Sequence, residues 1–233
     1  MEKSVVSLDD PDCLPATLLR ELQSCDRHFA ATSVIDSVQH EPAVSNVIDR
    51  INEYCQNNMV VGYHFTRAVR ADIEASGLQP RTGDAIRESF LSRFGTRFSA
   101  EQLSQIRESW TKCYTPQMQK VRDNRIWFNF TRKALDDSGA DLLLRFYGGE
   151  QVYFYINELP GVGEVLSSIG EPFIVRCALA PSEAHTIIGR PWGQIAASSY
   201  HRKVNPHAYQ VDQDGYQFSD VPAGCIELLR IEP

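Results

Sequence analysis

The sequence predicts an α+β fold, and three observations support this. Runs of aromatic and β-branched residues, typical of strands, recur along the chain at irregular intervals. Amphipathic helical patterns separate them without the strict alternation of strand and helix that a doubly wound sheet requires. Hydrophobic residues make up 42% and charged residues 23% of the 233 residues, enough to bury a sizeable core. The expected strands cover residues 60–67, 125–132, 151–156, 172–179 and 221–231.

The first 58 residues read as helical and polar, without strand alternation. The clearest helix covers residues 42–55, where Pro42 suits a first turn. Its apolar residues fall on one face at helical spacing: Val44, Val47, Ile48, Ile51 and Cys55. We expect residues 1–58 to form a helical segment packed on a core domain of residues 59–233. A partner-binding arm is the alternative interpretation.

A second helical region, residues 81–124, is predicted to be an insertion between two core strands. Ser99 and Gln102 form the sequence pattern of a capping box at a helix start. An apolar stripe follows at helical spacing: Leu103, Ile106, Trp110 and Cys113. We assign Trp110 to the core and not to a binding site.

The two best strands end in similar polar residues. Residues 64–67 read His-Phe-Thr-Arg, and residues 129–132 read Asn-Phe-Thr-Arg. Two neighbouring strands with such ends could open on one cleft. Later, Gly148 and Gly149 predict a turn that lets a ligand approach, followed directly by Glu150 and the strand 151–156. A plain turn with a solvated glutamate is the alternative.

Composition and missing motifs exclude several classes of protein. The net charge of −7 argues against a general duplex-binding surface. We find no phosphate-binding loop, dinucleotide fingerprint, zinc-protease motif or serine-hydrolase elbow. Residues 182–220 read as loops, and their histidines match no metal-site spacing, so no metal is expected.

Nothing in the sequence points to a membrane or to an oxidising compartment. No apolar run could span a bilayer, and the start lacks a signal-peptide pattern. The six scattered cysteines contain no C-x-x-C pair, which predicts reduced, mostly buried thiols in a cytoplasmic protein. Delivery to the cytosol of a target cell is a variant of this prediction.

Three short blocks resemble the ADP-ribosyltransferase superfamily. Tyr63-His64-Phe65-Thr66, followed by a helix that ends in Gly77-Leu78-Gln79-Pro80, resembles its histidine-bearing first block. Residues 127–131 and 221–227 resemble a middle block and the last strand region. The resemblance covers residues 60–233 in order, and it implies a split, mixed or antiparallel sheet with NAD as a substrate.

The resemblance also implies roles for named residues. His64, with Tyr63 and Thr66 beside it, would bind the adenosine ribose, and Arg67 would meet the pyrophosphate. Phe128 or Tyr147 would stack on the nicotinamide, with Thr131 on the same strand as Phe128. Cleavage of the nicotinamide–ribose bond develops an oxocarbenium-like cation, which a glutamate would stabilise.

The identity of that glutamate stays open at this point. Glu227 lies in the last strand region, but Cys225 stands where the family has its first polar residue. Glu150, after the Gly-Gly turn, is the other candidate. A third possibility is that neither is catalytic and the fold only binds a nucleotide.

The sequence therefore predicts an NAD-dependent mono-ADP-ribosyltransferase or NAD glycohydrolase. Its acceptor would be a protein or a nucleic acid, as in a bacterial toxin, an effector or a phage-defence factor. RNA 2′-phosphotransfer is a variant that would need a more basic cleft. The alternative from another class is a non-enzymatic nucleotide- or protein-binding module that engages a partner through residues 1–58.

Overall fold

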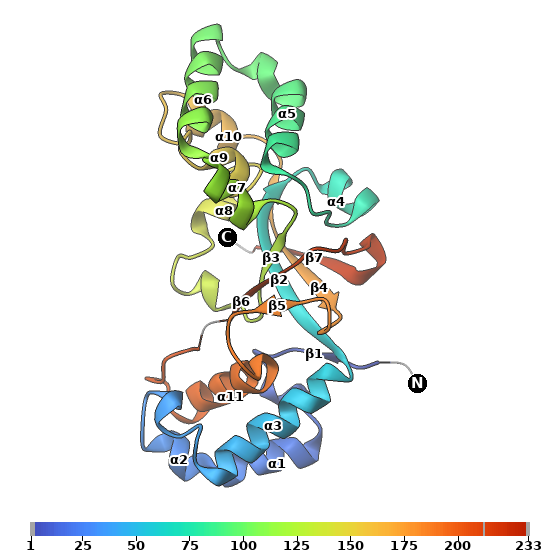
Figure 1. The fold of residues 1–233 in the computed structure, drawn as a ribbon, viewed down its shortest axis with the longest axis vertical. Helices are drawn as coiled ribbons and strands as arrows, with labels where there is room; N and C mark the ends of the chain where they lie inside the picture. Colours follow the sequence, from blue (N-terminus) through green and yellow to red (C-terminus); the bar gives the residue numbers. More distant parts are fainter. Residues whose placement is uncertain (1–2, 212, 232–233) are drawn as a thin grey trace. The chain divides into compact units, whose positions relative to one another are not determined.

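The fold is α+β, as predicted, and Figure 1 shows it for the computed structural model, which describes residues 3–211 and 213–231. The strands pair in the order β5-β6-β3-β2-β4-β7, and β1 pairs with β2 outside this path. Their bounds are β1 Val5–Val6, β2 Met59–Ala68, β3 Ile126–Asn129, β4 Glu171–Leu179, β5 His185–Thr186, β6 Asp214–Gln217 and β7 Ile226–Arg230.

The sheet contains both parallel and antiparallel strand pairs. β1 runs parallel to β2, with Val6 opposite Val60, so residues 1–58 contribute a strand that the sequence did not predict. β2 and β3 are antiparallel, with Tyr63 opposite Asn129. β5 and β6 are also antiparallel. Within the described residues, no helix is long and apolar enough to cross a membrane.

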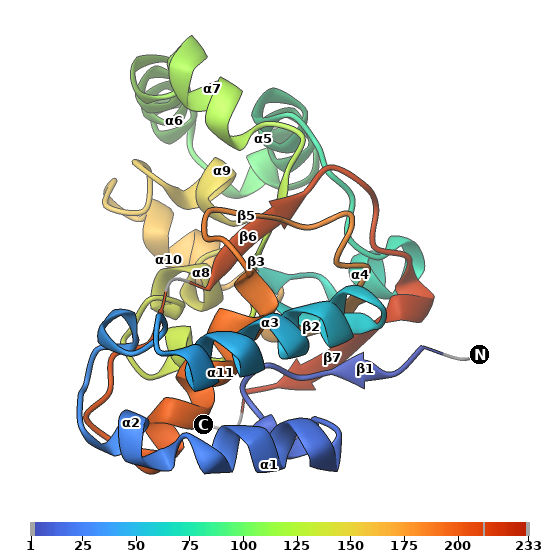
Figure 2. The same ribbon diagram turned by 60° about the horizontal axis from the view of Figure 1, so that its bottom comes forward.

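The chain forms two compact units, which we describe separately. The first contains residues 1–63, 127–132 and 177–216. Its helices are α1 Ala16–Ser24, α2 Asp26–Ala30, α3 Pro42–Gln56 and α11 Pro191–Val204. The predicted helix at 42–55 is confirmed as α3, and its five stripe residues are all buried. Figures 1 and 2 both show α11 lying beside α3.

The prediction that residues 182–220 are loops is wrong, because α11 lies within them. Pro191 occupies its first turn, and most of the helix is buried. A Cβ on Gly193 would lie 2.0 Å from the Ile48 carbonyl oxygen, so the glycine permits this close approach of α11 to α3. The buried His201 ring makes contacts of 2.9 and 2.8 Å from Nε2 to the carbonyl oxygens of Phe29 and Thr32.

The second unit contains residues 64–126, 133–176 and 217–233. The predicted insertion is helical, with α5 Gly83–Phe94, α6 Ala100–Cys113 and α7 Pro116–Arg122. The capping box of Ser99 and Gln102 is confirmed at the start of α6. The remaining helices of this unit are α4 Arg70–Ser76, α8 Asp141–Arg145, α9 Glu150–Tyr153 and α10 Val162–Ser167.

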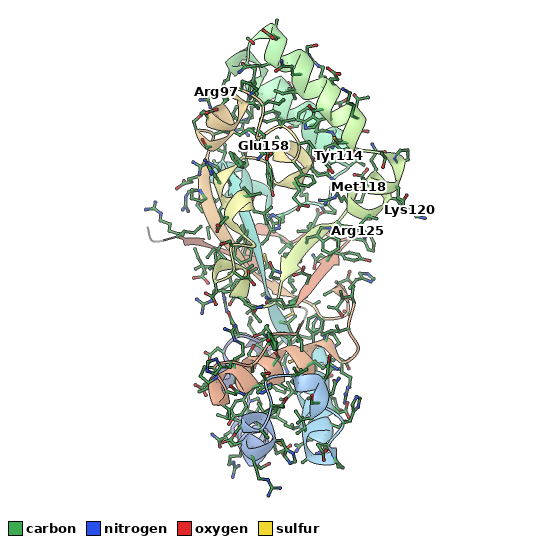
Figure 3. All side chains as sticks on the ribbon, turned by 90° about the vertical axis from the view of Figure 1, so that its left-hand side faces the viewer. Arg97, Tyr114, Met118, Lys120, Arg125 and Glu158 are labelled. Carbon is green, nitrogen blue, oxygen red and sulfur yellow. The ribbon has the colours of Figure 1, made fainter. Side chains whose placement is uncertain are left out.

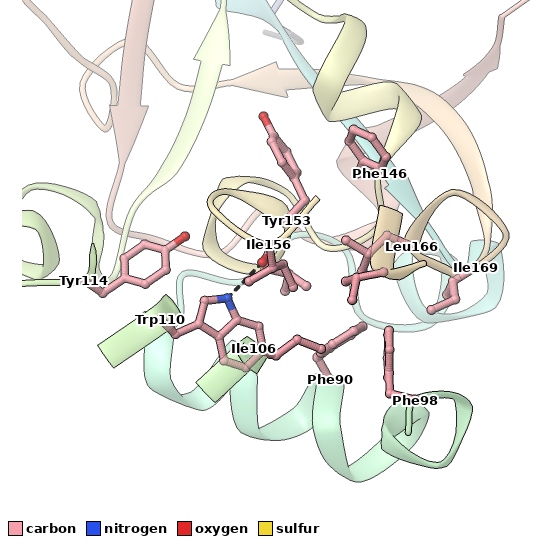
Figure 4. Close-up of a cluster of buried hydrophobic side chains, with 12 residues drawn as sticks. Phe90, Phe98, Ile106, Trp110, Tyr114, Phe146, Tyr153, Ile156, Leu166 and Ile169 are labelled. Carbon is pink, nitrogen blue, oxygen red and sulfur yellow. Dashed lines mark hydrogen bonds between the residues drawn. The ribbon is translucent and has the colours of Figure 1, made fainter. Parts of the chain in front are cut away.

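A buried cluster holds these helices together (Figure 4). Trp110 belongs to it, as predicted, and its indole Nε1–H donates to the carbonyl oxygen of Val152 at 3.0 Å. The cluster also contains Phe90, Phe98, Ile106, Tyr114, Phe146, Val152, Tyr153, Ile156, Val162, Leu166 and Ile169.

The predicted strand at 151–156 is wrong, because the chain forms the short helix α9 and a turn there. The carbonyl oxygens of α9 accept from side chains and not from a neighbouring strand. Tyr114 donates its hydroxyl to Glu150, and Trp110 donates to Val152. Val152, Tyr153 and Ile156 contributed to a strand-like pattern, but they are buried in the helical core instead.

Candidate functional site

A turn carrying Glu150 is fixed to the end of strand β2. The backbone N–H of Gly148 donates to the carbonyl oxygen of Arg67 at 3.2 Å, and Arg67 forms an isolated parallel bridge with Tyr147. Arg67 follows His64 by three residues on β2. The Gly-Gly turn thus joins the strand that bears the predicted histidine to one of the two predicted carboxylates.

The backbone angles of this turn require glycine at both positions, and at Gly148 a side chain would also collide with a neighbour. Gly148 has φ +85° and Gly149 has φ +64°, in the region that favours glycine. A Cβ on Gly148 would lie 2.5 Å from Cγ2 of Val152, whose side chain is buried, whereas a Cβ on Gly149 would meet nothing within 4 Å.

The Glu150 carboxylate is accessible and paired. It forms an ion pair with Arg122, the last residue of α7, and the Glu150 side chain is 44% exposed. The Arg122 guanidinium carbon lies 5.7 Å from the ring centroid of Phe154. The ion pair thus holds the Glu150 carboxylate in place through Arg122, whose guanidinium faces the Phe154 ring.

Arg67 anchors the backbone of the same unit. Its Nε donates to the carbonyl oxygen of Ile169 at 2.9 Å, and Nη1 donates to that of Leu144 at 3.4 Å. Burial lowers the pKa of Arg67 from its ordinary value, while the nearby Glu171 acts to raise it. Two donors of the guanidinium that the sequence assigned to the pyrophosphate are thus directed at main-chain oxygens.

His64 and Thr66 lie on one face of the sheet. Side chains alternate between faces along a strand, so both share the face of Gly62. A Cβ on Gly62 would lie 2.5 Å from Cδ1 of Leu179, so this is also the face of the odd-numbered residues of β4. His64 is half-buried and Thr66 is buried.

Glu227 lies on the opposite face of the sheet from His64. Its carboxylate pairs with Arg176 at 3.3 Å, and both side chains are substantially exposed. Arg176 is an even-numbered residue of β4, and it therefore points away from the face of Leu179 and His64. This placement counts against Glu227 as the partner of His64.

Tyr147 packs among the helices of the second unit. Its ring stacks on Phe90 with centroids 5.9 Å apart, and it meets Phe94 edge-on at 5.0 Å. Burial raises the pKa of Tyr147, and the nearby Arg93 acts to lower it. One face of the ring predicted to stack on nicotinamide is thus covered by Phe90.

Three predicted residues belong to the first unit. Tyr63 is buried, and its hydroxyl donates to Oδ1 of Asp9 at 3.2 Å and lies 3.3 Å from Oγ of Ser7. Burial raises the pKa of Tyr63. The other two are also buried: Phe128, and Thr131, which donates to Gln213.

The sequence did not single out Arg122 or Tyr114, the two residues that hold Glu150. Both lie in the insertion, 28 and 36 residues before Glu150, and no local spacing relates them to it. The hydroxyl of Tyr114 and the ion pair of Arg122 meet Glu150 only because α6 and α7 pack beside α9.

No family model, curated protein or solved structure matches the chain.

Proposed function

We propose that this chain cleaves the nicotinamide–ribose bond of NAD and transfers ADP-ribose to a macromolecular acceptor or to water. The observation that carries the proposal is the hydrogen bond from Gly148 to Arg67, which links the turn of Glu150 to the strand of His64.

A second contact supports the proposal by joining the first and last blocks of the resemblance. Leu78 and Val221 exchange two backbone hydrogen bonds, with N–O distances of 3.0 and 2.8 Å. A Cβ on Gly77, at φ +69°, would lie 2.0 Å from the Val221 carbonyl oxygen. Glycine is needed there for the two blocks to approach so closely.

In the proposed reaction, the C1′–N bond to nicotinamide breaks and the ribose develops positive charge at C1′. Nicotinamide leaves as a neutral molecule with the electron pair of the C1′–N bond, and the Glu150 carboxylate stabilises the charge at C1′. The acceptor or water then bonds to C1′ and loses a proton to solvent. His64 and Thr66 hold the ribose hydroxyls. We assign Arg67 the task of anchoring the backbone beneath the site, since its donors already bind main-chain oxygens.

The test is incubation of the protein with NAD labelled separately in nicotinamide and in adenine. We expect nicotinamide release by the wild-type chain and a large loss of it in His64→Ala. The control is His207→Ala, because His207 is an exposed histidine of the other unit. Equal turnover in His64→Ala and wild type, or no release by any form, would refute the proposal.

One observation favours the non-enzymatic alternative, a nucleotide-binding module. The Glu150 carboxylate is already paired with Arg122, so the site could hold a nucleotide without reacting with it. Calorimetry distinguishes the two functions: a binding module gives heat with NAD but leaves it intact, as chromatography of the recovered nucleotide would show.

A further inference from the structure

The helical insertion is basic although the chain is acidic. Residues 81–125, which comprise the insertion and Arg125 directly after it, contain nine Lys or Arg and five Asp or Glu, for a formal charge of +4. The whole chain carries −7, so the remainder carries −11. Such an asymmetry within one chain indicates a local site for an anionic partner.

A pair of aromatic rings, the half-buried Phe154 and the exposed Tyr155, lies against the basic insertion. Phe154 and Tyr155 have ring centroids 4.2 Å apart, and Tyr114 of the insertion meets Tyr155 edge-on at 5.9 Å. Tyr155 is 41% exposed and has φ +70°, which is rare for a bulky residue. Strained backbone that presents a large ring to solvent is typical of binding sites.

Cationic side chains lie between this aromatic pair and a further exposed ring, that of Phe218. Arg122 lies over Phe154, as described above, and Lys120 is exposed two residues earlier on α7. Arg125 Nη2 donates to the Lys120 carbonyl oxygen at 3.4 Å. The Arg125 guanidinium carbon lies 5.6 Å from the ring of Phe218, which is 51% exposed.

We call these six residues the α7 surface: Lys120, Arg122, Arg125, Phe154, Tyr155 and Phe218. Figure 3 shows Lys120 and Arg125 together with Met118 and Tyr114 along α7 and its flanks. Glu150 pairs with Arg122 and offsets part of its charge, whereas Lys120 is exposed.

We propose that the α7 surface binds a short stretch of single-stranded nucleic acid. Exposed rings at both ends offer stacking faces for unpaired bases, and the cations between them suit the phosphates. A duplex hides the faces of its bases and would also meet the strongly acidic remainder of the chain. An acidic peptide would use the cations but would leave the aromatic rings without a role.

The inference concerns binding alone and holds whether or not the chain cleaves NAD. Only the further step, that the bound strand is the acceptor of ADP-ribose, rests on the proposed function. The ion pair between Arg122 and Glu150 would place such a strand next to the proposed catalytic carboxylate.

The test is fluorescence anisotropy of labelled oligo(dT) and oligo(U) 12-mers with the full chain, without NAD. We expect saturable binding, with Tyr155→Asn weakening it about tenfold by removing a stacking face. Asparagine tolerates positive φ, so this variant keeps the backbone. Tyr209→Asn, at a tyrosine 70% exposed in the other unit, is the matched control.

The contribution of charge to binding is tested with Lys120→Gln. Its control is Arg27→Gln, which changes the net charge equally at an exposed site of the other unit. We expect Lys120→Gln, but not Arg27→Gln, to make the negative slope of log association constant against log salt concentration shallower by about 0.7. The relative affinities of oligo(dT) and oligo(U) distinguish DNA from RNA. Binding of a 12-bp duplex as tight as that of the single strands, full displacement by poly-glutamate, or wild-type affinity in Tyr155→Asn would each overturn the proposal.

Discussion

The backbone N–H of Gly148 donates to the carbonyl oxygen of Arg67 at 3.2 Å, and this contact ties the turn before Glu150 to strand β2. Gly148 and Arg67 are 81 residues apart in the sequence. Their contact gives the second unit a strand with a histidine and a carboxylate-bearing turn side by side.

Replacing the two candidate glutamates separates their roles. Each pairs with an arginine, Glu150 with Arg122 and Glu227 with Arg176, so Glu→Gln makes the same change at both. We expect Glu150→Gln to slow nicotinamide release about 100-fold or more, since charge stabilisation at the reacting centre is worth that much. Glu227→Gln should stay near wild type because it lies on the other face of the sheet. The steady-state rate of nicotinamide release is measured for both variants. A larger loss of rate in Glu227→Gln than in Glu150→Gln would make Glu227 the catalytic carboxylate.

The Gly-Gly turn offers a matched pair of stability variants. Both residues have positive φ, and Gly149 also has ψ −173°, backbone angles that cost alanine about 1–3 kcal/mol. Gly148→Ala should cost more than Gly149→Ala, because only its Cβ would press on the buried Val152. Urea unfolding of the two variants gives the comparison. Equal losses would show that Val152 can move aside.

Arg67 is expected to act on stability more than on NAD binding. Arg67→Met keeps the aliphatic stem but leaves the carbonyl oxygens of Ile169 and Leu144 without this donor, at a cost of about 1–3 kcal/mol. Arg107→Met, at an exposed site on α6, should change stability by less than about 0.5 kcal/mol. Urea unfolding and the KM for NAD are the two readouts. A raised KM for NAD with an unchanged free energy of unfolding would show that Arg67 binds the pyrophosphate of NAD instead.

The thiol of Cys55 makes stability depend on alkaline pH. Burial raises its pKa from 9.0 to about 12. Above pH 9 the unfolded chain releases the thiol proton while the folded chain keeps it, so this contribution to stability falls as pH rises from 9 to 12. The slope is at most about 1.4 kcal/mol per pH unit. Cys55→Ala should remove it, as measured by the difference between wild-type and variant unfolding free energies across that range.

Thiol labelling provides a second measurement of the same burial. Cys55 should resist alkylation at pH 8 in the folded chain and react after denaturation, because the thiolate is the reactive form. Cys225 is exposed and should react first. Early labelling of Cys55 would show that the first unit opens locally around α3.

The sequence by itself predicted the elements whose periodicity is local. The stripe of Val44, Val47 and Ile48 predicted α3, and Ser99 with Gln102 predicted the start of α6. The pattern of β2 predicted its strand in the same way. In each case the signal lies within one turn or one strand, where neighbouring residues alone determine the backbone preference.

One missed element had a readable signal. Trp192, Ile195, Ala196 and Tyr200 follow helical spacing, and Pro191 suits a first turn, yet the polar residues between them suggested a loop. The misread strand at 151–156 had no such signal. Its aromatic residues favour a strand locally, whereas the α9 carbonyls accept from two distant donors, Trp110 on α6 and Tyr114 directly after it.

Tertiary structure alone decided which residues meet at the candidate site. The sequence named His64, Glu150 and Glu227, but it could not place Glu227 on the opposite face, because that depends on the pairing of β4 with β2 and on the contact with Arg176. It also could not bring Arg122 to Glu150. Both results come from contacts between residues far apart in the chain, which no local spacing encodes.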